Sequence, residues 1–152
     1  MEEKYMRQCL QLAKKAFRSG NPPVGSILVV DHQVIGKGIE SGKSSGDVTD
    51  HAEIMAIRDA LAKGHQDSLP RAVIYTTHEP CIMCSYVIRH HQIPRIVYGS
   101  SVPYSGGHTS RFDVLLAEDV PTWKQLPEVV SGVLLDECEK LTEEFKALKK
   151  QT

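Results

Sequence analysis

The chain has almost no net charge and no long hydrophobic run. Its 152 residues carry 18 Lys and Arg against 19 Asp and Glu, so the formal net charge at pH 7 is -1. Such a balance gives no broad positive field to attract a polyanion, and no apolar run approaches the roughly 20 residues of a membrane span. The first residues, Met1-Glu2-Glu3-Lys4, are unlike a signal peptide. We therefore expect a cytoplasmic protein without a membrane partner.

Cysteine is scarce, with four residues in the whole chain. Without an export signal these residues are expected to be thiols and not a disulfide framework. Cys9 and Cys138 fall on apolar helix faces, where a thiol side chain fills the core. The ordinary proportions of hydrophobic (41%) and charged (24%) residues predict one globular domain over residues 1–152.

The other two cysteines belong to a pattern of metal ligands. His51-Ala52-Glu53 is followed by Pro80-Cys81-Ile82-Met83-Cys84. Zinc binds imidazole nitrogen and thiolate sulfur in a tetrahedron, and a catalytic site leaves the fourth position to water. Zinc lowers the pKa of that water toward neutrality, and Glu53 is placed to move its protons. The pattern predicts one catalytic zinc ion per chain, bound by His51, Cys81 and Cys84.

Each part of this pattern also has a structural interpretation. Asp50 and Glu53 fit an Asp-x-x-Glu capping box, in which Glu53 would only stabilise a helix N-terminus. The Cys81/Cys84 pair alone is compatible with a redox pair or half of a structural zinc site. A structural site needs a fourth protein ligand, and His78 is the candidate. In that case the chain would be a non-catalytic zinc subunit or an RNA-binding module.

Hydrophobic periodicity and turn residues divide the chain into helices and strands. Helices are expected over residues 6–17, 51–63, 81–91 and 134–148, and strands over 26–30, 33–39, 72–76, 95–98 and 128–130. The first two strands are expected to form a hairpin across Asp31-His32, and residues 40–50 a loop that leads to His51. The stretch from 72 to 98 needs a crossover, which makes its strands parallel. The fold class is therefore α/β, with His51 and Cys81 at two helix N-termini.

Basic residues gather at two places in the sequence. One group lies near the C-terminus and is expected to be a solvated helix end that complements the helix dipole. The other group is a candidate for contact with phosphate. The first group is Lys146, Lys149 and Lys150, and the second is Arg89, His90, His91 and Arg95.

The zinc pattern resembles the cytidine deaminase-like superfamily of zinc deaminases. The likeness extends from about residue 4 to the last helix and is closest to the branch of bacterial tRNA adenosine deaminases and guanine deaminases. It rests on Pro23-Val24-Gly25, Val34-Ile35-Gly36 and residues 51–57, 77–84 and 132–138. The resemblance implies a three-layer α/β/α sandwich with a five-stranded mixed sheet, assembled as a homodimer.

The same resemblance implies a role for each residue of the pattern. His51, Cys81 and Cys84 would bind the zinc ion, whose hydroxide attacks a ring carbon that bears an exocyclic amine. Glu53 would be the acid/base that delivers protons to the departing ammonia. Backbone groups at Ala52 and Cys81 would contact the reacting centre. The implied enzyme is a zinc-dependent hydrolase.

One departure from the tRNA-specific branch lies at the end of the second strand. That branch has an asparagine that holds the base, whereas this chain has Glu40. An ionised carboxylate only accepts hydrogen bonds. If Glu40 contacts the substrate, it favours a ring edge with adjacent N–H donors, as in guanine or isocytosine, over the acceptor nitrogens of adenine. The alternative is an ordinary exposed residue at a strand end.

A second departure follows the fourth strand, where the tRNA-specific enzymes carry a basic, polar loop. Residues 100–108 contain no Lys or Arg, and the next basic side chain is Arg111. Because nucleic-acid affinity depends on neutralising phosphates, this loop favours a small substrate. Tyr104 and His108 are candidates to stack on or bond to a free base.

From the sequence we therefore predict a zinc-dependent hydrolytic deaminase of a free nucleobase or similar aminated heterocycle, guanine-like by preference. The alternative within the same class is tRNA-specific adenosine-to-inosine deamination.

Overall fold

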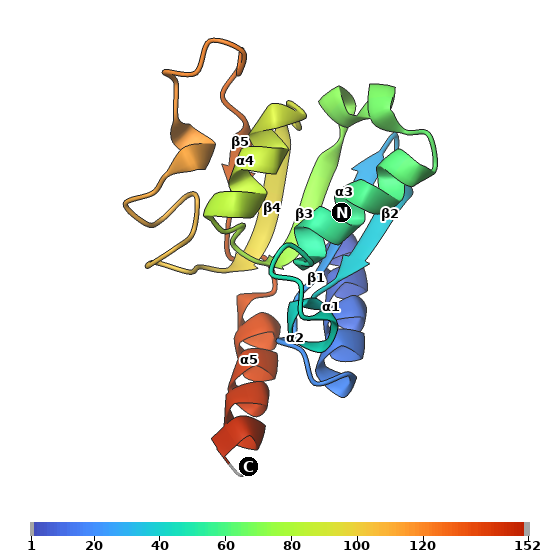
Figure 1. The fold of residues 1–152 in the computed structure, drawn as a ribbon, viewed down its shortest axis with the longest axis vertical. Coiled ribbons are helices and arrows are strands. Elements are labelled where there is room, and N and C mark those ends of the chain that lie inside the picture. Colours follow the sequence, from blue (N-terminus) through green and yellow to red (C-terminus); the bar gives the residue numbers. More distant parts are fainter. Residues whose placement is uncertain (1, 151–152) are drawn as a thin grey trace.

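Five strands form one mixed sheet at the centre of the fold. The computed structural model describes residues 2–150. The helices are α1 (Glu2–Arg18), α2 (Gly42–Ser45), α3 (Ala52–Ala62), α4 (Ile82–His90) and α5 (Leu135–Lys150). The strands are β1 (Gly25–Val30), β2 (Gln33–Ile39), β3 (Val73–His78), β4 (Arg95–Ser100) and β5 (Glu128–Val130). They lie in the order β2-β1-β3-β4-β5 (Figure 1).

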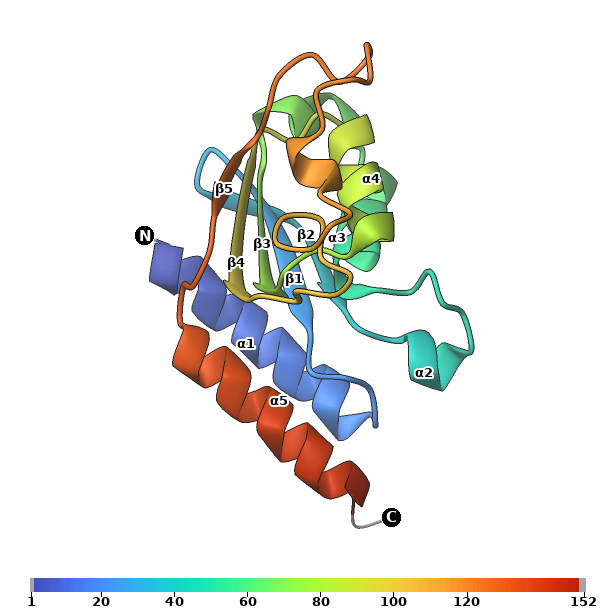
Figure 2. The same ribbon diagram turned by 90° about the vertical axis from the view of Figure 1, so that its left-hand side faces the viewer.

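The helices cover both faces of this sheet. Helices α1 and α5 lie on one face, and α3 and α4 lie on the other (Figure 2). Alternate strand residues supply the two cores because successive side chains of a strand point to opposite faces. Ile27 and Tyr75 pack with α1 and α5, whereas Leu28 and Ile74 pack beneath α3 and α4. The predicted three-layer α/β/α sandwich with a five-stranded mixed sheet is confirmed.

The strand pairing follows the predicted connections. Strands β1 and β2 are antiparallel and joined across Asp31 and His32, which both have positive φ, as a two-residue hairpin turn requires. Strand β1 is also antiparallel to β3. The β3–α4–β4 unit makes a parallel pair, and β5 extends the sheet parallel to β4. The buried thiols of Cys9 and Cys138 belong to the core between α1, α5 and the sheet, as expected.

Three short helices were not anticipated. The expected loop over residues 40–50 contains the four-residue helix α2, and residues 66–71 and 114–116 form 3-10 helices. None of these segments is long enough to show a hydrophobic period. Helix α1 begins at Glu2, earlier than the apolar pattern indicates, because its first turn is polar. None of the described helices combines the length and apolar character needed to cross a bilayer.

Glycines in β2 bring α3 directly onto the sheet. A Cβ atom at Gly38 would overlap the carbonyl oxygen of Ala52 and the backbone nitrogen of Ala56. A Cβ atom at Gly36 would overlap the carbonyl oxygen of Ala56. The close contact fixes the N-terminal turn of α3, which follows His51, above the end of β2.

Candidate metal centre and active site

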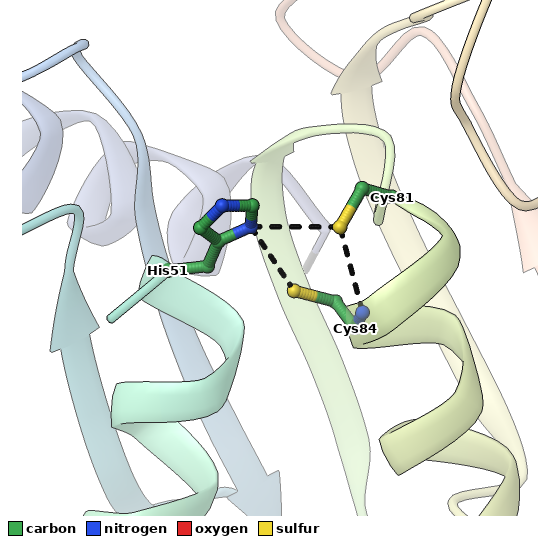
Figure 3. Close-up of side chains that lie close together, drawn as sticks. All are labelled: His51, Cys81 and Cys84. Carbon is green, nitrogen blue, oxygen red and sulfur yellow. Dashed lines mark hydrogen bonds between the residues drawn. The ribbon is translucent and has the colours of Figure 1, made fainter. Parts of the chain in front are cut away.

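Three metal-ligand side chains converge where α3 and α4 begin. His51 is the N-cap residue of α3, Cys81 is the N-cap residue of α4, and Cys84 lies in the first turn of α4 (Figure 3). The Nδ1 atom of His51 lies 3.5 Å from the sulfur of Cys81 and 3.5 Å from the sulfur of Cys84. All three donor atoms lie within 4.8 Å of one another. The fold therefore brings together the three residues predicted as ligands.

The spacing of these atoms fits a tetrahedral zinc ion. Zinc binds imidazole nitrogen at about 2.0–2.1 Å and thiolate sulfur at about 2.3 Å, so two such ligands of a tetrahedron lie about 3.6 Å apart. The separations of 3.5 Å in this site match that value. Among residues 2–150 no other group of three or more His, Cys, Asp and Glu side chains is arranged to hold a metal ion.

His78 does not close the site as a fourth ligand. Its Nδ1 atom lies 3.1 Å from the Thr77 hydroxyl, and its Nε2 atom lies 2.9 Å from the hydroxyl of Thr142 in α5. Burial lowers the pKa of His78 to about 4, so the ring is neutral at pH 7. The interpretation as a closed structural zinc site, with His78 as the fourth ligand, is therefore wrong. The side chain instead joins the end of β3 to α5.

Glu53 lies beside the metal ligands in a fully enclosed position. The Thr76 hydroxyl of β3 donates a hydrogen bond of 3.2 Å to Glu53 Oε1. Burial raises the pKa of Glu53 to about 7, and the nearby sulfur of Cys81 adds to this effect. The capping-box interpretation is wrong, because His51 is the N-cap of α3 and makes no side-chain cap. Asp50 instead accepts a hydrogen bond of 2.8 Å from Arg58.

The charge of the site favours a thiolate at Cys81. The Cys84 thiol donates to the Cys81 sulfur, and this bond, helped by His51, lowers the pKa of Cys81 to about 4. The backbone N–H of Cys84 also donates to this sulfur at 3.5 Å. The hydrogen bond with Cys81 in turn raises the pKa of His51 to about 9. A helix N-terminus at Cys81 adds its positive dipole end, so the donor set is suited to a divalent cation.

Glu40 lines a hollow that reaches the metal ligands. The hollow has a volume of about 410 Å³. Its walls are Pro22, Glu40, Gly42, Lys43, Gly46, Val48, His51 and Lys149. Glu40 is 9% exposed, so the interpretation as an exposed strand-end residue is wrong. Burial raises its pKa, and its Oε2 atom accepts a hydrogen bond of 3.1 Å from the N–H of Gly42.

The loop after β4 is held against the metal centre by Glu79. This buried carboxylate accepts hydrogen bonds from the backbone N–H groups of Val102, His108 and Thr109, at 2.7–2.8 Å. It also accepts one from the Thr109 hydroxyl. The four bonds lower the pKa of Glu79 although burial opposes them. A bridge between Cys81 and Gly106 then joins the loop to the start of α4.

The two side chains predicted on this loop differ in their surroundings. The Nδ1 atom of His108 lies 2.8 Å from the Tyr98 hydroxyl, which fixes the imidazole over β4. Tyr104 is 81% exposed. Thr76 and Glu79 were not anticipated from the sequence. The only signal for Glu79 was its place directly before Pro80, and nothing local indicated which groups it would bind.

The prediction that Arg89 of α4 and Arg95 of β4 contact phosphate is wrong. Arg89 is buried and donates to the carbonyl oxygens of Val114 and Leu115. Arg95 forms ion pairs with Glu2 and Glu128. Both guanidinium groups are therefore used within the fold.

Comparison with known proteins agrees with this geometry. Residues 1–100 match the cytidine and deoxycytidylate deaminase zinc-binding region. The chain belongs to this family. It is 40% identical to the tRNA-specific adenosine deaminase of Haemophilus influenzae over 138 residues, which cover 90% of this chain and 78% of that protein.

Two solved structures share the fold. One comes from a study of A-to-I editing by tRNA:A34 deaminases at the wobble position of transfer RNA. It has a TM-score of 0.80 and is 35% identical in sequence to this chain. The match covers 91% of this chain and 98% of that one. The structure of NE0047 with 2,6-diaminopurine has a TM-score of 0.76 over 97% of this chain and 82% of that one; at 20% identity it shows the fold alone. This member of the zinc deaminase family is therefore a zinc-dependent hydrolytic enzyme, with His51, Cys81 and Cys84 as its candidate zinc site.

Proposed function

We propose that this chain deaminates adenosine in tRNA, with His51, Cys81 and Cys84 as the zinc ligands and Glu53 as the acid/base. The observation that carries the reaction is the three-donor centre beside the enclosed carboxylate of Glu53. The relatives that support tRNA as the substrate match at 40% and 35% identity and cover at least 90% of the chain. They favour the tRNA alternative over the free-base prediction made from the sequence.

Bound zinc would supply a hydroxide nucleophile at neutral pH. Glu53 takes a proton from the attacking water and delivers it to the ring nitrogen next to the reacting carbon. It then takes the remaining proton from the hydroxyl added to the ring carbon and carries it to the exocyclic amine, which leaves as ammonia while the carbonyl oxygen forms. A carboxyl group with a pKa of about 7 holds and releases a proton equally well near neutral pH, as this shuttle requires. We propose that the backbone groups of Ala52 and Cys81, at the N-termini of α3 and α4, contact the reacting centre.

A second candidate substrate is a free base of the guanine or isocytosine type. The observation that favours it is the carboxylate of Glu40, which lines the same hollow as His51. An ionised carboxylate accepts hydrogen bonds and complements adjacent ring N–H groups, whereas adenine presents an acceptor nitrogen beside its amine. Tyr104 and His108 would contact such a base from the loop that Glu79 holds.

The variant Glu53→Gln tests the proposed acid/base. Its side chain keeps nearly the same shape and can still accept a hydrogen bond from Thr76, but it cannot take up a proton. We expect kcat for ammonia release to fall by about 10²–10⁴-fold, the usual contribution of a general acid/base, while zinc content and the free energy of unfolding stay near those of the wild type. Ammonia release at the wild-type rate with Gln at this position would disprove the role of Glu53.

A substrate screen separates the two candidates. Ammonia release is measured with tRNA, adenosine, adenine, guanine, isocytosine and cytosine at equal enzyme concentration. Release from tRNA supports the proposal, whereas release from guanine or isocytosine but not from tRNA replaces it with the second candidate. The variant Glu40→Asn is the matched test of the hollow. It should lower kcat/KM for a base with adjacent N–H donors relative to adenosine.

A further inference from the structure

Two lysines from distant parts of the chain meet at the hollow that contains Glu40 and His51. Lys43 lies in α2, three residues after Glu40, and Lys149 lies in the last turn of α5. Both line the hollow of about 410 Å³, a size within the range of about 300–1,000 Å³ for small-ligand sites. A wall with cationic side chains therefore belongs to the same cavity as a predicted zinc ligand.

The two ammonium groups are close enough to interact directly. A contact with Lys149 lowers the pKa of Lys43, as expected for two like charges held together. Phe145, one turn earlier in α5, helps to position Lys149: the ammonium group of Lys149 lies 5.1 Å from the centre of the Phe145 ring. An anion between the two ammonium groups would add two attractions that offset this repulsion.

The helix dipole explains why each lysine lies at a helix C-terminus, but not why the two lysines lie close together. Both residues lie in the last turn of a helix, where a cation is favourable. Lys146 and Lys150 occupy the same end of α5, yet neither lines the hollow, and Lys146 lies 3.8 Å from Glu143. The helix dipole therefore does not account for the position of Lys43 and Lys149 in the wall of the same cavity.

We propose that Lys43 and Lys149 bind a phosphate group of the substrate while its base lies toward His51 and Glu53. This inference rests on the proposed deaminase function and favours a substrate that carries phosphate over a nucleoside or a free base. A nucleoside without phosphate and a free base fill only the inner part of the cavity. The phosphate is either the diester of an RNA chain or the monoester of a free nucleotide.

The test compares substrates that share one base and differ in phosphate. Ammonia release is measured on a nucleoside, on its 5′-monophosphate and on an RNA hairpin that carries the same base in its loop. The wild type is expected to have a KM at least about tenfold lower for one of the phosphate-bearing forms than for the nucleoside, as one or two phosphate contacts give. Preference for the hairpin identifies a diester, and preference for the monophosphate identifies a free nucleotide.

The variants Lys43→Ala, Lys149→Ala and the double variant should remove this preference. KM for the phosphate-bearing form should rise toward that of the nucleoside, kcat should change by less than twofold, and the salt dependence of KM should weaken. Lys150→Ala is the matched control, because it removes the same charge from the same helix end but outside the hollow. Its KM should stay within twofold of the wild type.

The results separate this inference from the deaminase function. A wild type that acts equally well on the nucleoside and the phosphate-bearing forms, or only on the free base, overturns the phosphate site. So does a double variant that behaves like Lys150→Ala. In those cases the Glu53→Gln variant still tests the reaction itself, since its loss of ammonia release depends only on the metal centre.

Discussion

Thr76 shows how a residue without chemistry of its own supports the active site. Its hydroxyl donates the hydrogen bond of 3.2 Å that holds the buried carboxylate of Glu53. The variant Thr76→Val keeps the shape and β propensity of the side chain but removes the donor. A hydrogen bond to a charged group is worth about 1.5–3 kcal/mol, so we expect kcat for ammonia release to fall by roughly 10–100-fold. Zinc content, measured by metal analysis, should not change.

Thr76→Ser is the control for this prediction. It retains the hydroxyl and loses only a methyl group, so it should recover most of the wild-type kcat. Equal losses in the Val and Ser variants would mean that packing at this position, and not the hydrogen bond, controls the rate.

His78 should make folding stability depend on pH. Burial lowers its pKa from 6.5 to about 4, so between these values the unfolded chain binds more protons than the folded one. The stabilising contribution is complete above pH 6.5 and is lost as pH falls toward 4, by about 1.4 kcal/mol per pKa unit. In urea unfolding at pH 7 and pH 4.5, the wild type should therefore lose about 2–3 kcal/mol more than His78→Gln, which has no titrating ring. An identical loss in both proteins would assign the acid sensitivity to other groups.

The residues of the metal centre could be predicted because they lie in two short motifs. His51 and Glu53 are two positions apart, and Cys81 and Cys84 occupy one helical turn, so spacing and residue type indicate their chemistry. Thr76 and Glu79 could not be predicted. Their partners lie 23–30 residues away in the sequence. The packing of α3 on the sheet brings Glu53 to Thr76, and the β3–β4 pairing brings the loop after β4 to Glu79. Glu40 was found through a comparison with relatives, and its burial became evident only in the fold.

At the level of elements, prediction succeeded where a long hydrophobic period existed. Helices α1, α3, α4 and α5 each bury a face of apolar residues, and all five strands were expected. Helix α2 has no buried residue and owes its position to hydrogen bonds, one with the neighbouring Glu40 and one with Asn21, 23 residues earlier in the chain. Such bonds leave no periodic pattern, so the helix that carries Lys43 to the hollow was not foreseen.

Gly38 tests how the sheet positions α3. A methyl group at this position would overlap backbone atoms of Ala52 and Ala56. Because backbone cannot yield as a side-chain end does, Gly38→Ala should shift the first turn of α3 and destabilise the fold by about 1–3 kcal/mol, the cost of overpacking. We expect lower zinc content as well, because His51 begins this helix. Denaturant unfolding and metal analysis measure the two effects.

Lys37→Ala is the control for this variant, since it adds no atoms and alters an exposed position of the same strand. Its free energy of unfolding should stay within about 0.5 kcal/mol of the wild type. Full zinc binding and stability in Gly38→Ala would show that α3 can move without disturbing the ligands.

On the scale of the whole molecule, exposed apolar side chains gather on α4 and the chain that follows β4. Ile82 and Tyr86 of α4 are 40% and 54% exposed, and Phe112 and Leu116 are exposed nearby in the chain that packs on α4. Tyr86 also makes an edge contact with Trp123. Large exposed apolar groups close together are typical of an interaction surface. We propose a second copy of the chain as the partner, which is the assembly expected from the sequence.

We therefore expect a homodimer that uses this face, with a mass of twice 16.9 kDa by light scattering after size-exclusion chromatography. A standard interface buries about 800 Å² per partner, roughly a tenth of the total surface of 8180 Å².

Tyr86→Asp places a charge in that interface and should give a monomer at micromolar concentration. Leu148→Asp is the control, because Leu148 is equally exposed but lies on α5, away from α4. A wild-type monomer, or dissociation by both substitutions, would exclude this face as the dimer interface. Because α4 begins at the ligand Cys81, dissociation by Tyr86→Asp should also lower ammonia release, which ties the assembly to the metal centre.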